Sequence, residues 1–250
     1  AGVGLLKLPG LPADLRRLQA AAAIGQCALM AAYEEYLSPV GYHASQLLLT
    51  ASDFDHRSRC LNVRNTILTL FEWNCIPIIN ENDTVSVAEI KFGDNDQLAA
   101  MVTNLLRAPL LILLTNVDGL YNADPHEQPN AQLLSTVTEI DNSITALAAN
   151  TKSSFGSGGM RSKLKAARLV TIAGDSVIMA NGSEPAILED ILSAKPVGTL
   201  FLPRGGLFSA RKRWIGLIAK PRGKLVVDDG ARRALVEKGR SLLPIGILDV

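Results

Sequence analysis

The strongest constraint on the fold is an alternation between short apolar runs and longer stretches of helical periodicity. Strand-like runs of four or five mostly apolar residues recur along the chain, at Gln46–Leu49, Ile76–Ile79, Leu110–Leu114 and, more briefly, Val177–Met179. The stretches at 60–73, 97–106 and 160–172 have the length and spacing of helices. Strands that alternate with helices form parallel sheets with helical crossovers. The sequence therefore predicts an α/β fold.

Further helices are expected outside this alternation. Pro12-Ala13-Asp14 opens one that runs through residues 20–23 or beyond, with Asp14 in its first turn, where the helix dipole favours negative charge. A second helical stretch includes Leu29–Tyr36 and ends at Ser38-Pro39. A short helix is predicted at Pro185–Leu192, because proline is tolerated at a helix start.

The character of the sequence changes after Phe201. Pro203–Gly206 has linker composition, and strand-like pieces follow at Trp214–Ile218 and Leu225–Val227. Pro-Arg-Gly and Asp-Asp-Gly segments near these pieces indicate turns. A second, β-rich domain is therefore expected to begin in this region.

Composition excludes several classes of protein. The net charge of +1 gives no global field to recruit nucleic acid or anionic membrane. The longest clean apolar run, Leu110–Leu114, falls far short of the roughly 18 to 20 residues that span a bilayer, so we expect a cytoplasmic protein without membrane contact. Its three cysteines are scattered, which favours buried thiols over disulfides or a zinc site, and its three histidines receive no catalytic role.

Polar segments lie directly after the predicted strands or at helix starts, where open α/β sheets bind their ligands. Asn80-Glu81-Asn82-Asp83 follows a strand, although a plain polar turn would have the same composition. Gly93-Asp94-Asn95-Asp96 precedes a helix. One acidic residue there would be explained by a helix cap, but the surplus of acids suggests a bound ammonium, lysine or metal.

Two more segments complete the set. Gly156–Lys163 joins glycines to a helix start, a combination that suits phosphate, although it lacks the Walker A order and such turns are common. Leu114–Tyr121 closes a predicted buried strand with a polar turn, in which Asp118 and Gly119 taken singly are ordinary turn residues.

The order and spacing of four motifs resemble the glutamate 5-kinases of the amino acid kinase family. These motifs are Ile79–Asp83, Glu89–Asp96, Leu114–Tyr121 and Gly156–Lys163. The resemblance covers essentially the whole chain and implies a three-layer sandwich around a central, mostly parallel sheet. It also implies ATP-dependent phosphorylation of the side-chain carboxylate of L-glutamate, the first step of proline synthesis, with ATP and Mg²⁺ as cofactors.

The resemblance also implies roles for individual residues. Asn80, Asp83 and Asn95 would hold glutamate, and Glu89 and Asp94 would lie near the same site and near a site for feedback inhibition by proline. Asp96 would orient phosphate-binding lysines, and with Lys163 it forms the implied catalytic pair. The implied ATP-binding residues are Thr115, Asn116, Ser157, Gly158, Gly159, Met160, Arg161, Ser162 and Lys163. No residue is expected to form a protein-only metal site.

The tail resembles the start of a PUA domain in Lys212-Arg213-Trp214, Val227–Ala231 and Ser241–Ile247. We therefore expect a kinase domain at 1–205, a linker at 206–221 and a partial PUA-like domain at 222–250 that is too short to build its own core. RNA could contact this tail, although a short basic run is more often a solvated linker. A homo-oligomer is also expected.

The resemblance fails at the start of the chain. Family members begin with a lysine-bearing strand, a glycine-containing phosphate loop and a second strand, and the printed sequence starts beyond that point. Gly2-x-Gly4 is read as a packing or substrate-side segment, and Lys7 is not assumed to replace the lysine. The expected result is an incomplete kinase, whose activity as a fragment is left open. Another kinase of this family or a non-catalytic protein that binds glutamate, proline or RNA are the alternatives.

Overall fold

The computed structural model describes residues 2–85, 95–125, 127–148, 159–204, 215–216 and 223–249. The chain divides into two compact units, Ala1–Ile218 and Ala219–Val250. Most of the predicted linker and the predicted strand Trp214–Ile218 lie outside the described residues. The assignment of the second unit to a PUA-like domain stays a prediction.

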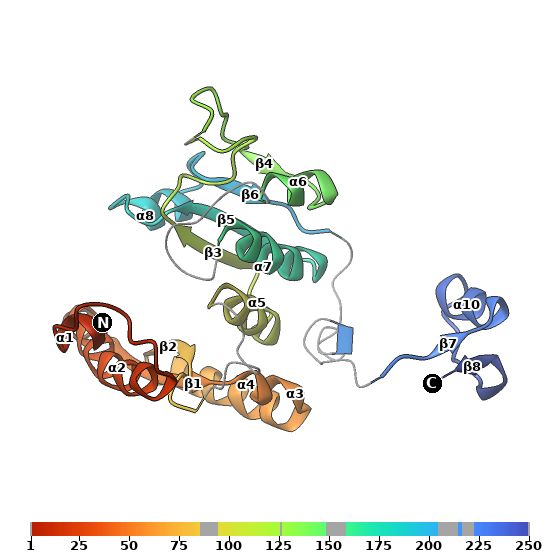
Figure 1. The fold of residues 1–250 in the computed structure, drawn as a ribbon, viewed down its shortest axis with the longest axis horizontal. Coiled ribbons are helices and arrows are strands. Elements are labelled where there is room, and N and C mark those ends of the chain that lie inside the picture. The colour runs from red at the N-terminus through yellow and green to blue at the C-terminus, as the bar shows by residue number, and fades with distance from the viewer. Residues whose placement is uncertain are drawn as a thin grey trace. The chain divides into compact units, whose positions relative to one another are not determined.

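The elements of the first unit alternate between helices and strands over most of its length (Figure 1). In chain order they are α1 (Gly2–Leu5), α2 (Leu15–Leu37), η1 (Ser38–Val40), β1 (His43–Leu49), α3 (Ala51–Asp55), α4 (Arg57–Glu72), β2 (Cys75–Glu81), α5 (Asn95–Leu106), β3 (Leu110–Thr115), β4 (Thr136–Val137), α6 (Asn142–Leu147), α7 (Met160–Ile172), β5 (Ser176–Asn181), α8 (Ile187–Leu192) and β6 (Thr199–Phe201). The second unit contains β7 (Val226–Val227), α10 (Asp229–Val236), η4 (Pro244–Gly246) and β8 (Ile247–Asp249). The predicted α/β class is confirmed.

The described strands of the first unit form two sheets. β1 and β2 pair in parallel, with His43 opposite Cys75. The other sheet has the order β3-β5-β6-β4, in which β3 and β5 are parallel and β6 is antiparallel to β5. Pairing is therefore mostly parallel, as the alternation of strands and helices predicts.

Helix α2 is a single helix of 23 residues, so the prediction of two separate helical stretches is wrong. Gly25 lies in its interior and is buried. The short helix α1 packs here, because a Cβ on Gly2 would come within 1.8 Å of the Ala21 carbonyl oxygen and 3.2 Å of the Gly25 nitrogen. Small residues on both helices allow this close approach, and the packing interpretation of Gly2 is supported.

Helix α5 belongs to two hydrophobic cores. Its Ala100 is buried in the core built around β3, β5, β6 and α7. Its Leu98, Met101 and Leu105 are buried in a second core with Phe54 and residues of β1 and α4. Burial of such side chains contributes about 1.5–3 kcal/mol each. The position of α5 is therefore fixed from two sides.

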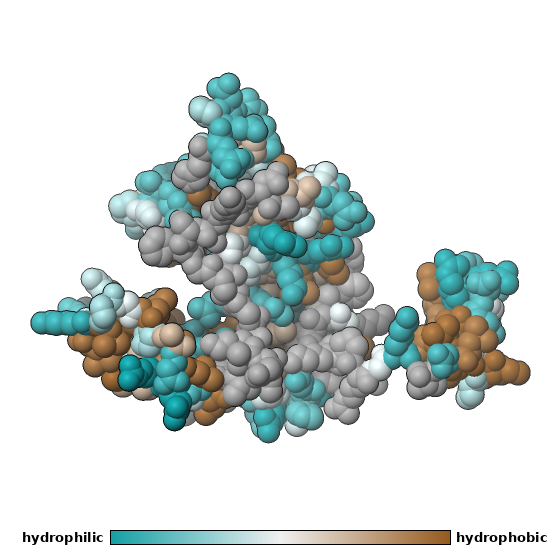
Figure 2. Space-filling model, viewed as in Figure 1, coloured by the Kyte–Doolittle hydropathy of each residue, from teal (hydrophilic) through white to brown (hydrophobic). Residues whose placement is uncertain are grey.

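Apolar surface remains exposed in both units. Brown surface covers much of α1 and α2 in Figure 2. Leu5 of α1, Ile24 of α2 and Leu11 between the two helices are exposed. Among the described residues of the second unit, no apolar side chain is buried, and Ile245 is 90% exposed. This unit therefore has no hydrophobic core of its own within the residues described, which agrees with its expected size limit.

Four further predictions need correction. The Asp-Asp-Gly segment is a helix start, because the Asp228 side chain accepts a hydrogen bond from the Ala231 N–H at 2.6 Å and caps α10. Strand β3 is not fully buried, since Leu114 is exposed. Helix α8 begins at Ile187, two residues after the proline. Burial is correct for Cys60, but Cys27 is exposed and Cys75 is half-buried.

Candidate functional site

Two helices begin at the edge where the parallel strands β3 and β5 end. Helix α5 leads into β3, and α7 leads into β5, each through a short connection. A helix that returns along a sheet before a strand begins near the carboxyl end of that strand. The first turns of α5 and α7 therefore meet at the sheet edge that typically binds ligands in this class of fold.

An ion pair joins these two first turns. Lys163 Nζ lies 3.1 Å from Asp96 Oδ1 and 3.0 Å from Asp96 Oδ2. The two side chains are only 15% and 12% exposed, whereas the surface pair of Lys195 and Asp190 is 60% and 27% exposed. Solvent therefore screens the Lys163–Asp96 interaction much less.

Helix dipoles explain why the lysine needs this partner. Both helices present their positive ends here, so Asp96 in the first turn of α5 is stabilised, and Lys163 in the first turns of α7 is disfavoured. Contact with the Asp96 carboxylate offsets this cost. The arrangement gives a fixed cation beside two helix N-termini, and such a place attracts an anion such as phosphate.

The predicted nucleotide residues that are described lie around this edge. Thr115 is the last residue of β3, and the exposed Asn116 follows it, with Thr115 Oγ1 donating to Asn116 Oδ1 at 3.3 Å. Gly159 is the N-cap residue of α7, and Met160–Lys163 form its first turn. Ser157 and Gly158 lie outside the described residues. Thus the described members come from β3 and α7.

A polar cluster at the same edge includes a residue that sequence reasoning missed. Asp118 accepts hydrogen bonds from Tyr121 Oη at 2.9 Å and from Asn181 Nδ2 at 3.0 Å. Asn181 ends β5, and Thr115 lies opposite it in the register. The same rule that selected polar residues after other strands could have selected Asn181. The cluster ties the loop after β3 to the end of β5.

Tyr121 is kept in its neutral form within this cluster. Partial burial, and next the neighbouring Asp118 carboxylate, raise the pKa of Tyr121 above its ordinary value. The phenol therefore stays protonated throughout the physiological range and continues to donate its hydrogen bond. Any stability gained from the neutral phenol is present below pH 10 and is lost only as the pH rises through the raised pKa.

The predicted glutamate residues divide between β2 and α5. Asn80 lies within β2 rather than in a turn after it, and Asp83 follows in the turn. Asp83 borders a pocket of about 230 Å³, whose other walls are residues of α1, the start of α2 and Leu11. Asn95 is the first residue of α5, directly before Asp96. A residue of the expected glutamate side is therefore adjacent to one of the expected phosphate side.

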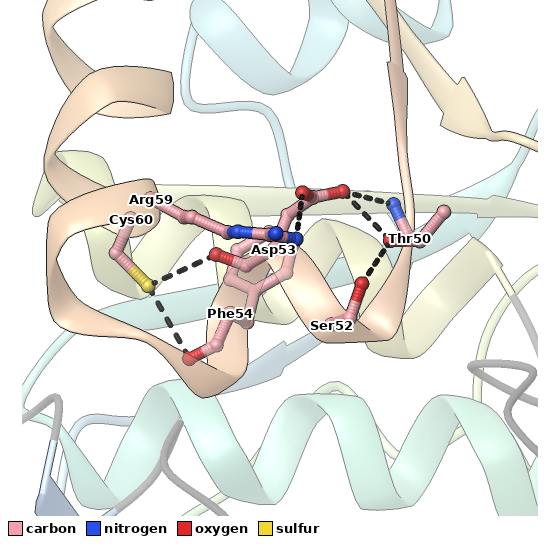
Figure 3. A network of polar contacts seen from close by, with 6 residues as sticks. All are labelled: Thr50, Ser52, Asp53, Phe54, Arg59 and Cys60. Atoms are coloured by element: carbon pink, nitrogen blue, oxygen red, sulfur yellow. Dashed lines mark hydrogen bonds and ion pairs between the residues drawn. The ribbon is translucent and has the colours of Figure 1, made fainter.

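A hydrogen-bonded cap forms where the chain leaves β1, at the strand end beside that of β2 (Figure 3). Asp53 Oδ2 accepts from the Thr50 N–H and from Thr50 Oγ1, both at 2.8 Å. The first of these bonds and the contact of the Thr50 side chain with the Asp53 backbone form a capping box for α3. Cys60 Sγ donates to the carbonyl oxygens of Asp53 and Phe54. The cap holds the turn rigidly beside the expected glutamate side, and its Thr-x-x-Asp pattern was readable in the sequence.

Other predicted features carry less information. Glu89 and Asp94 lie outside the described residues, as does His126. Within the described ranges, histidine, cysteine and acidic side chains form no group of three or more that could hold a metal ion. No helix in the same ranges is long and apolar enough to cross a membrane.

A comparison with protein families matches residues 4–181 to the amino acid kinase family. The chain belongs to this family. The four motifs and the first turns of α5 and α7 all lie within the residues matched to this amino acid kinase family.

Within this family, the curated relatives with similar sequences include several glutamate 5-kinases. Glutamate 5-kinase of Desulfotalea psychrophila is 48% identical over 239 residues, which cover 96% of this chain and 64% of that protein. Glutamate 5-kinase of Geobacter sulfurreducens is 47% identical over 250 residues, which cover 100% of this chain and 67% of that protein. The chain thus spans about two thirds of the length of these curated relatives.

Solved structures agree with the fold. UMP kinase from Bacillus anthracis matches with a TM-score of 0.52 at 12% identity, over 83% of this chain and 75% of that one. An isopentenyl phosphate kinase matches with a TM-score of 0.51 at 19% identity, over 80% of this chain and 78% of that one. At such identities the likeness concerns the fold alone.

Proposed function

We propose that this amino acid kinase transfers the terminal phosphoryl group of ATP to the side-chain carboxylate of L-glutamate, as the first step toward proline. The observation that carries the proposal is the largely buried ion pair of Lys163 and Asp96 between the first turns of α5 and α7. The match to curated glutamate 5-kinases along the whole chain supports glutamate as the acceptor.

This phosphoryl transfer needs no general base. The side-chain carboxyl of glutamate has a reference pKa of about 4.3, so it is ionised near pH 7 and can attack without losing a proton. Charge spreads over the equatorial oxygens of the transferred group, and fixed cations and N–H groups stabilise it. Lys163 would supply the cation, and the first turn of α7 would supply N–H groups. Asp96 would hold Lys163 in place.

In this proposal glutamate would bind beside the pair of Lys163 and Asp96, on the side away from the nucleotide. Asp83 would meet the ammonium group of glutamate, and Asn80 and Asn95 would bind its carboxylates through their amide N–H groups. Thr115 and Asn116 would border the nucleotide. A Mg²⁺ ion would supply further charge neutralisation, held mainly by phosphate oxygens.

Proline would inhibit from a site near Glu89 and Asp94, the enzyme would act in the cytoplasm as a homo-oligomer, and the second unit would be the start of a PUA-like domain with at most weak RNA contact. Each rests on the resemblance to glutamate 5-kinases.

The direct test is acceptor-dependent ADP formation by the purified protein. We expect L-glutamate to support turnover, and acetylglutamate, aspartate and UMP to support little or none. Turnover with one of these instead would assign the chain to another activity of the family. Calorimetric binding of glutamate without ADP formation would favour a non-catalytic binding protein.

Replacing Asp83 with alanine should raise the KM for glutamate about 10- to 100-fold and change kcat only a few-fold. The reason is that a hydrogen bond to a charged group is worth roughly 1.5–3 kcal/mol and Asp83 would meet the bound ammonium group in both ground and transition states. Steady-state kinetics with varied glutamate measure this. Asp190→Ala, at a surface ion pair, is the matched control. A normal KM in the Asp83 variant would remove it from the site.

A further inference from the structure

Gln26 of helix α2 contacts Asn80, one of the residues expected to bind glutamate. Asn80 Nδ2 donates a hydrogen bond to Gln26 Oε1 at 3.3 Å, although the residues are 54 positions apart in the sequence. Helix α2 packs against the β1 strand that neighbours β2. Both side chains are partly buried, so water competes weakly for the contact.

The backbone fixes which end of the Asn80 amide faces Gln26. Asn80 Oδ1 accepts from the Glu81 N–H at 3.0 Å, which leaves the Nδ2 group to point toward Gln26. A carboxamide nitrogen carries two hydrogens, and one of those on Asn80 Nδ2 is donated in the hydrogen bond to Gln26 Oε1. The second hydrogen of Asn80 Nδ2 is thereby held in a defined direction.

Gln26 and Asn82 each have one buried side-chain atom without a hydrogen-bond partner among the described residues. Gln26 Nε2 is buried and has no hydrogen-bond partner within the described part of the chain. The Oδ1 atom of Asn82, two residues beyond Asn80, is also buried and without a partner among the described residues. A buried donor or acceptor without a partner costs free energy, so such groups in a native protein need an explanation. The Gln26 donor, on a side chain that contacts β2, and the Asn82 acceptor, directly after β2, would suit a ligand that carries both a carboxylate and an ammonium group.

We propose that Gln26 is a positioning residue, which holds the Asn80 amide with one N–H directed at the carboxylate of bound glutamate. This inference rests on the proposed function. Gln26 acts through Asn80 and takes no part in phosphoryl transfer. Its role is to remove the rotational freedom of the Asn80 side chain before the substrate arrives, which lowers the entropic cost of binding.

Gln26→Met tests the role, because methionine keeps the length of the side chain and removes the acceptor. The KM for glutamate should rise about 3- to 10-fold, while kcat and the KM for ATP change less than twofold, as expected from the loss of one hydrogen bond made in both ground and transition states. Gln46→Met, at an exposed position of β1, is the matched control and should behave like the unmodified protein.

A double-variant cycle separates positioning from a general structural effect. If Gln26 acts through Asn80, Gln26→Met should add little to the KM of an Asn80→Ala protein. Full additivity, or a KM in Gln26→Met equal to that of Gln46→Met, would overturn the role of Gln26 and leave the kinase function intact. An unmodified protein without glutamate-dependent turnover would overturn the kinase function itself, and the role of Gln26 with it.

Discussion

Replacing Lys163 with methionine should lower kcat about 10²- to 10³-fold, the usual cost of removing one fixed group that stabilises transition-state charge. The KM for glutamate should change much less, because in the proposed site Lys163 would contact the transferred phosphate rather than glutamate. Methionine keeps most of the side-chain volume and removes only the charge and the hydrogen-bond donors. The loss should therefore concern the chemical step.

The measurement is steady-state kinetics with saturating ATP and varied glutamate. Lys195→Met is the control, since Lys195 also pairs with an aspartate 2.6 Å away but on the surface. Exposed pairs of this kind contribute at most about 1 kcal/mol. Unchanged turnover in the Lys163 variant would show that the pair with Asp96 serves only the fold.

Replacing Phe54 with alanine should lower the free energy of unfolding by about 3–5 kcal/mol. Phe54 is 1% exposed and packs in the core that also contains Leu98, Met101 and Leu105 of α5. Its loss would leave a cavity beneath the helix whose first turn carries Asn95 and Asp96. A domain of this size has roughly 5–15 kcal/mol in total, so the variant should be only marginally stable.

Urea unfolding followed by circular dichroism gives the comparison. Phe71→Ala removes the same side chain from a position that is 50% exposed, and its cost should stay below about 1 kcal/mol. Equal shifts of the two midpoints would mean that the packing of Phe54 does not support the core.

Local patterns predicted the elements that have strong local signals. The boundaries of α7 match the sequence prediction, because glycines precede it and the polar Gly174-Asp175 ends it. The unity of α2 was missed, because Gly25 weakens a helix by only about 1 kcal/mol and tertiary packing overrides that cost. Helix α10 was missed because Asp-Asp-Gly suits both a turn and a helix cap.

The site residues follow a similar division. The family resemblance implied that Asp96 and Lys163 act together, but residue spacing alone could not predict their contact, which spans 67 positions and depends on how α5 and α7 pack. The contact between Gln26 and Asn80 also depends on tertiary structure. The positions of these two residues in the sequence do not predict that they touch. Sequence periodicity describes single elements, whereas these contacts come from the way elements meet.

Because α5 is buried in both hydrophobic cores, neither core can melt and leave the other complete. Ala100 on one side and Leu98 with Met101 on the other would have to leave their neighbours together. Among the described residues, no backbone hydrogen bonds between strands connect the two sheets of the first unit. The packing of α5 against both cores connects them instead. Heat or denaturant should consequently abolish the two sheets of the first unit in a single cooperative transition.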